Sequence, residues 1–268
     1  DVALGWSDGR LVSDPIEAMA TRHMVADRPA PWRSGLKHDL SRILELVELD
    51  GSLFTQDDQP VDIETDCVYP LAKGSDVANL RTNCPDRRVL VPQRAMNDST
   101  RAMSRTLPKT YRYLESHRDA FARRKSSIYR GRDPFAVFGV GSYTFAPWKV
   151  AICGLYKRLT FAVFGPIDGR PVVFDDTTYC LALETESQAL HVKRLLESDM
   201  AIRFFSARLF WDAKRPVTAA LLRSLDLAAV AAEMGCDDEH QRLFGQSQED
   251  QLPVNTPKSE CDRVTPST

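Results

Sequence analysis

The 268-residue chain is almost neutral, with 35 Lys and Arg against 37 Asp and Glu, and 43% of its residues are apolar. This composition is typical of a soluble globular protein with a substantial core, and no apolar run reaches the roughly 18 residues of a membrane-spanning helix. The six cysteines form no Cys-x-x-Cys pair and lie at no metal-ligand spacing from a histidine, which argues against a zinc site or disulfide framework and favours a cytoplasmic protein. Because the chain begins at Asp1 without a signal-peptide pattern, we expect a fragment of a longer polypeptide or a processed chain.

The first half of the chain carries mixed patterns. Residues 1–33 are rich in proline near their end, so we expect a loop-like, poorly packed entry segment. The next stretch, 34–54, has two interpretations. Its leucines and isoleucine fit a helical stripe, but Asp50-Gly51 also fits the turn of a β-hairpin. A strand is expected at 87–93, and a basic amphipathic helix is expected to start at Pro108 and run through 109–126.

The second half changes to short β-type runs and then to helices. Apolar runs between turn signals predict strands, without intervening helices, at 135–140, 148–154, 159–165, 171–175 and 179–185. Helical patterns follow at 186–198, 200–211 and 217–226. We therefore expect an α+β fold with an antiparallel or mixed β-sheet core flanked by helices. The polar, acidic segment 233–268 is expected to be a disordered tail.

The charge of the chain is unevenly distributed. Residues 101–133 contain ten Lys and Arg against three acidic residues, a local charge of +7, whereas residues 233–268 have a local charge of −5. Such a basic block indicates an anionic partner surface, although a solvated helix face would look the same.

No catalytic site can be assembled from the sequence. The loop Gly139-Val140-Gly141 has Thr144 where a dinucleotide-binding loop needs a third glycine, and the expected strand that follows cannot offer a helix N-terminus to a phosphate. Asp175 and Asp176 are adjacent, and adjacent side chains on a strand point to opposite faces. We therefore expect no catalytic, metal or cofactor site in this chain.

A series of seven segments in order resembles the C-terminal target-recognition (specificity) region of bacterial adenine-N6 DNA methyltransferases, as found in restriction-modification enzymes. The resemblance covers residues 32–225, and its segments are WRSGLKHD, YPLAKGSDVAN, RVLVPQR, YLESHRDAFARRKSSIY, FAVFGVGSYTFAPWKVAICG, PVVFDDTTYCLAL and LLESDMAIRFFSARLFWDAKRPVT.

The resemblance implies a division of labour. In that family a methyltransferase domain binds S-adenosylmethionine and grips the flipped adenine with an Asp/Asn-Pro-Pro-aromatic tetrapeptide. This chain contains no such tetrapeptide, since Asp133-Pro134-Phe135 lacks the second proline. We therefore expect residues 34–232 to be a DNA target-recognition domain that is not catalytic alone. Its expected partners are double-stranded DNA and a methyltransferase domain, upstream or in another subunit, that carries S-adenosylmethionine.

The expected DNA contacts lie on the basic segment, on the glycine turn and on two flanking loops. They are Lys73, Arg123, Arg124, Lys125, Arg130, Tyr143, Lys149, Lys214 and Arg215. Phe145 and Trp148 are either part of the same contact surface or core residues of the sheet. Two other functions stay open: a protein-interaction module that docks an acidic partner through residues 101–133, and a small enzyme that uses Asp175 and Asp176 with a divalent ion.

Overall fold

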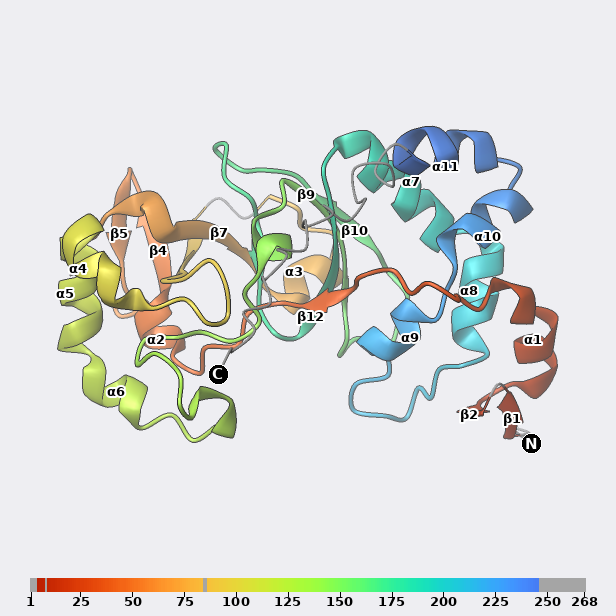
Figure 1. Ribbon diagram of the computed structural model, residues 1–268, viewed down its shortest axis with the longest axis horizontal. Helices are drawn as coiled ribbons and strands as arrows, with labels where there is room; N and C mark the ends of the chain where they lie inside the picture. The colour runs from red at the N-terminus through yellow and green to blue at the C-terminus, as the bar shows by residue number, and fades with distance from the viewer. Residues whose placement is uncertain (1–3, 8, 84–85, 246–268) are drawn as a thin grey trace, which may run out of the picture.

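The computed structural model describes residues 4–7, 9–83 and 86–245, which form two lobes, each built on a β-sheet (Figure 1). The first lobe contains a six-stranded mixed sheet in the order β11-β7-β8-β4-β5-β6. All its neighbouring strands are antiparallel except β11 and β7, which run parallel. Its strands are β4 (Glu45–Leu49), β5 (Ser52–Phe54), β6 (Pro60–Val61), β7 (Val68–Ala72), β8 (Arg87–Leu90) and β11 (Val173–Phe174).

The second lobe contains a four-stranded antiparallel sheet in the order β10-β9-β12-β3. Its strands are β3 (Arg33–Ser34), β9 (Trp148–Cys153), β10 (Ala162–Phe164) and β12 (Thr178–Leu183). The expected α+β fold with an antiparallel and mixed sheet core flanked by helices is thus confirmed.

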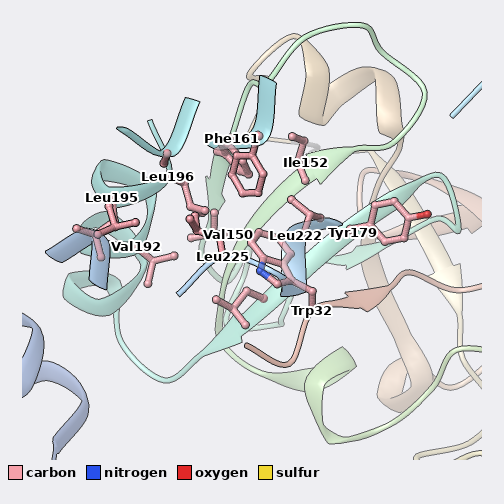
Figure 2. Packing of buried hydrophobic residues seen from close by; sticks show 14 of the residues in the cluster. Trp32, Val150, Ile152, Phe161, Tyr179, Val192, Leu195, Leu196, Leu222 and Leu225 are labelled. Atoms are coloured by element: carbon pink, nitrogen blue, oxygen red, sulfur yellow. The ribbon is translucent and has the colours of Figure 1, made fainter. Parts of the chain in front are cut away.

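The central strand β9 is apolar on both faces because helices cover both. Side chains alternate along a strand, so Val150 and Ile152 lie on one face and belong to the same buried cluster as Val192 and Leu195 of α7 (Glu186–Leu196); Figure 2 labels these residues. The intervening Ala151 joins the opposite cluster with helix α3 (Gly74–Ala78). Burial on both faces explains why this strand reads as a continuous apolar run.

The helices fall into two groups. Beside the first sheet lie α2 (Ser41–Leu44), α4 (Met103–Thr106), α5 (Pro108–Ser116) and α6 (Arg118–Ala122). The helix expected over 109–126 therefore starts correctly at Pro108 but breaks at His117 and ends at Ala122. The second lobe contains α1 (Pro15–Ala20), α7, α8 (Asp199–Ser206), α9 (Ala219–Arg223), α10 (Leu227–Glu233) and α11 (Asp237–Phe244) (Figure 1).

The two interpretations of residues 34–54 are resolved in favour of the hairpin. Strands β4 and β5 pair antiparallel, and their turn residues Asp50 and Gly51 have φ angles of 49° and 76°. Two consecutive positive φ angles are what a two-residue hairpin turn of this twist requires, and Asp-Gly is a preferred pair for it. The helical stripe is realised only over the four residues of α2.

Both ends of the described chain are more ordered than the sequence suggested. Met24 and Trp32 of the supposed entry segment are fully buried in the second lobe, and Arg208 donates to the carbonyl of Ala18 at 3.0 Å. The expectation of a poorly packed segment 1–33 is therefore wrong for Met24 and Trp32, whereas Trp6, Ile16 and Met19 are exposed. The expected disorder after residue 233 is wrong for α11, and residues 246–268 lie outside the described part of the chain.

The junction between the lobes is a close backbone crossing at Gly35. The amide of Leu36 donates to the carbonyl of Phe174 at 2.7 Å, and Lys37 and Phe138 pair by a single antiparallel bridge. A Cβ on Gly35 would lie 2.2 Å from the carbonyl oxygen of Asp175, so no side chain fits there. The strand expected at 135–140 is thus a buried connecting segment with one bridge, which corrects that prediction.

Candidate nucleic-acid interface

A basic loop follows α6 and lines two neighbouring hollows. The first, of about 420 Å³, is lined among others by Arg118, Lys125 and Arg130, and the second, of about 430 Å³, by Met96–Asp98 and Arg130–Asp133. Arg123, Lys125 and Arg130, three of the expected DNA contacts, are exposed. The loop therefore presents positive charge on both sides of Arg130.

Asp133 fixes the base of this loop. Its carboxylate accepts hydrogen bonds from the backbone amide of Thr100 at 2.9 Å and from the amide of Phe135 at 3.1 Å. Burial alone would raise the pKa of Asp133, but the hydrogen bonds from Thr100 and its neighbours lower it below the usual value. The carboxylate is thus used to hold the loop and stays ionised.

Arg124 is not a surface residue like its two neighbours. Its guanidinium lies over the ring of Tyr129 at 3.7 Å and donates to the carbonyls of Ala136 at 2.6 Å and Pro134 at 3.0 Å. Burial lowers the pKa of this guanidinium. Arg124 was expected to contact DNA from the surface, and this expectation is corrected. Its donors instead connect the basic loop to the segment that follows it.

Lys73 is bound within the first lobe. Its ammonium lies 2.6 Å from the carboxylate of Glu45, which also lies 3.3 Å from Nε2 of His38. Burial would raise the pKa of Glu45, but the hydrogen bonds from His38 and Lys73 lower it. Because this carboxylate is buried and ionised, the charge of Lys73 is compensated inside the protein.

The glycine turn, residues 139–143, is shaped by a close approach of two backbone segments. Gly139 adopts a φ of +79°, and a Cβ there would lie 2.7 Å from the carbonyl oxygen of Gly35. Tyr143 is half-buried on the turn that follows, with the guanidinium of Arg33 5.9 Å from its ring centre. Burial raises the pKa of its phenol. The glycines therefore allow a close backbone approach rather than a phosphate-binding loop.

Lys149 lies inside the protein, which corrects the expectation that it reaches DNA from the turn. The residue is only 1% exposed, and its ammonium donates to the carbonyls of Ala146 at 2.6 Å and Val172 at 2.9 Å. Burial lowers its pKa to about 8. The side chain ties the end of the glycine turn to the segment before β11.

Two of the predicted residues lie on the loop between α8 and α9. Lys214 is exposed, whereas Arg215 is half-buried and donates to the carbonyl of Asp176 at 3.3 Å. The carboxylate of Asp176 in turn lies 3.9 Å from the ammonium of Lys37. This loop and the basic loop after α6 lie along the same lower edge of the molecule in Figure 1, one in each lobe.

The carboxylates of Asp175 and Asp176 have different partners. Asp175 accepts a hydrogen bond from the hydroxyl of Thr177 at 2.6 Å, so its carboxylate shapes the turn before β12. Within residues 4–7, 9–83 and 86–245, no group of three or more His, Cys, Asp or Glu residues is placed to hold a metal ion. No helix in these ranges is long and apolar enough to cross a membrane.

Two further arginines belong to this surface and were missed from the sequence. The exposed Arg94 places its guanidinium 4.5 Å from the ring centre of Phe145. Arg132 donates to the carbonyl of Met96 at 3.2 Å and lies 6.0 Å from the ring centre of Phe138. No local sequence pattern connects Arg94 with Phe145, which lies far along the chain.

Comparison with known proteins finds similarity in sequence and in structure. No protein-family model matches the chain. The type II methyltransferase M.NspV from Nostoc sp. is 40% identical over 229 residues, which are 85% of this chain and 48% of the relative. Among solved structures, the type IIL restriction-modification enzyme MmeI in complex with DNA matches 85% of this chain and 30% of its own, at 13% identity and a TM-score of 0.44.

The sequence relation is the informative one. An identity of 40% over 229 residues makes the chain homologous to part of a type II methyltransferase, so the expected relation to methyltransferases is confirmed at this level. The chain spans about half the length of the curated relative that it matches.

Proposed function

We propose that this chain binds double-stranded DNA in a sequence-dependent way and orients an adenine-N6 DNA methyltransferase on its target site. The observation that carries the proposal is the homology to one half of a type II methyltransferase. The chain lacks the catalytic tetrapeptide and a glycine-rich cofactor motif, so we assign it the recognition half. S-adenosylmethionine belongs to the other half, and the system serves restriction-modification or phage defence.

The basic loops supply the contacts that position the duplex. Of the predicted contacts, Arg123, Lys125, Arg130 and Lys214 are exposed. The segments that carry them, after α6 and between α8 and α9, lie along one edge of the molecule (Figure 1). DNA carries one phosphate charge per about 1.7 Å of axis, and each cation that neutralises a phosphate releases a counterion. Phosphate contacts set orientation, while other side chains must read the base edges.

Selection from a randomised duplex library at near-physiological salt tests the proposal. Enrichment of one short motif, with affinity that falls steeply as salt rises, is the expected result. Salt-sensitive binding without a motif would mean that readout needs the methyltransferase half. If the folded chain binds no duplex, the proposal is wrong, and an acidic protein partner for residues 101–133 becomes the better assignment.

A pair of charge-matched variants tests the proposed edge. Arg130→Ala should weaken binding about equally for all duplexes and reduce the salt slope by about one, as expected for a lost phosphate contact. The control is Arg242→Ala, an exposed arginine of α11, and this helix lies on the opposite side of the molecule in Figure 1. Equal effects of the two substitutions would show that only the net charge matters and not this edge.

A further inference from the structure

The loop that carries Arg94 is held rigidly at the side of the basic surface. The carboxylate of Asp98 accepts hydrogen bonds from the backbone amides of Arg94 at 3.0 Å and Ala95 at 2.7 Å. The side chain of Gln93 is buried, accepts from the amide of Val137 at 3.1 Å and donates to the carbonyl of Ala95 at 3.0 Å. The backbone at Arg94 is therefore fixed from both sides.

The same loop is connected to the basic loop and to the glycine turn. Arg132 donates to the carbonyl of Met96 and to the side chain of Asn97, both at 3.2 Å. Gly139 donates its amide to the sulfur of Met96 at 3.2 Å. Arg94 thus lies beside the hollow that Arg130 and Arg132 line.

The guanidinium of Arg94 lies on a small aromatic platform. It is 4.5 Å from the ring centre of Phe145 and 5.8 Å from that of Tyr69, and the two rings are 5.1 Å apart. A guanidinium held over aromatic rings is attracted by their electron density and loses little further freedom when it binds. Within the described part of the chain, this guanidinium makes no hydrogen bond, although the residue is exposed.

We propose that Arg94 is a specificity-determining residue that donates its two parallel N–H groups to the O6 and N7 atoms of a guanine in the bound duplex. This inference rests on the proposed function and adds which base of the target site Arg94 recognises. A planar fork matches the two acceptors of guanine in the major groove. The aromatic platform fixes the plane of that fork, which a phosphate contact does not require, and the nearby Arg130 is available for a phosphate.

The test measures affinities for a panel of duplexes in which each base pair of the selected motif is replaced in turn. We expect the unmodified chain to prefer guanine at one position by about 10- to 100-fold. Arg94→Ala should abolish that preference at that position and leave the others unchanged. Arg94→Lys keeps the charge but has no planar fork, so it should retain overall affinity and still lose most of the preference.

Two further variants test whether the aromatic ring positions Arg94, and whether the loss of any positive charge has the same effect. Phe145→Leu removes the ring beneath the guanidinium and should reduce the guanine preference several-fold while Arg94 is still present. Its thermal unfolding must match that of the unmodified chain, and otherwise Arg94→Lys alone decides the question. Arg242→Ala on α11 should leave the preference intact.

The opposing outcomes are distinct. If Arg94→Ala weakens all duplexes equally and Arg94→Lys restores them, the residue contacts a phosphate and the inference is wrong. An unchanged guanine preference in Arg94→Ala also overturns it, as does a selected motif without a required guanine. If the unmodified chain selects no motif at all, the proposed function fails together with this inference.

Discussion

The buried ammonium of Lys149 gives a quantitative prediction for the stability of the protein. Burial lowers the pKa of Lys149 from its ordinary value of 10.5 to about 8. One pKa unit corresponds to about 1.4 kcal/mol, so this difference is worth about 3 kcal/mol. Between pH 8 and 10.5 the unfolded chain binds more protons at this residue than the folded chain. The contribution of Lys149 to the free energy of unfolding therefore rises with pH over this window.

The test compares the unmodified chain with Lys149→Met by urea unfolding from pH 7.5 to 10.5. Relative to the variant, the unmodified protein should gain about 3 kcal/mol of unfolding free energy across that range. Titrating groups that do not interact with Lys149 are present in both proteins and cancel in the difference. Cys180 does interact with Lys149, but burial raises the pKa of its thiol to about 11, above this pH range. Parallel curves for the two proteins would refute the reasoning, because they would mean that the ammonium is solvated.

The same variant decides whether Lys149 takes part in DNA binding. The substitution leaves the carbonyls of Ala146 and Val172 without their donor, at a cost of about 1–3 kcal/mol. Provided the protein remains folded, the slope of log affinity against log salt should not change. A decrease of about one would restore Lys149 to the set of phosphate contacts.

Two further predictions concern stability. The carboxylate of Glu64 accepts the first amides of α5, and these bonds overcome the effect of burial and lower its pKa to about 2. Glu64→Gln should therefore lower the unfolding free energy by about 1 kcal/mol at pH 7, and this loss should shrink as pH falls from 4.5 towards 2, as urea unfolding will measure. Gly139→Ala combines left-handed strain with a contact 2.7 Å from the carbonyl of Gly35. It should lower the melting temperature more than Gly169→Ala, where φ is +72° but nothing lies within 4 Å, and equal losses would contradict the close approach.

The parts of the fold that the sequence predicted well are those with a local cause. The Asp50-Gly51 turn, the start of α5 at Pro108 and the runs that became β9 and β12 each depend on residues within a few positions. Hydrophobic periodicity failed at 135–140, where Phe135, Val137 and Val140 are buried in the core of the first lobe and only one bridge forms. That segment is apolar because it is covered, not because it is a strand.

The candidate site was only partly predictable because a side chain's direction depends on distant residues. Lys149 belongs to a strand that is buried on both faces, so alternation could not place its ammonium. Arg94 was missed because its aromatic platform is assembled from β7 and from the turn before β9. Residue type and local charge density predicted the basic loop. Which of its basic side chains are bound within the protein and which stay exposed could be seen only in the folded structure.

The local charge of +7 overstates the charge that this region can offer to DNA. The fold uses cations of this segment internally: Lys109 lies 2.8 Å from Asp62, which is outside the segment, and the donors of Arg124 are bound by backbone carbonyls. A cation already compensated by a fixed acceptor must break that contact before it can neutralise a phosphate, and much of the electrostatic gain is then lost. The exposed Lys125 and Arg130 carry no such cost, so the affinity of this edge for DNA should depend on a few loop residues rather than on the total charge of the segment.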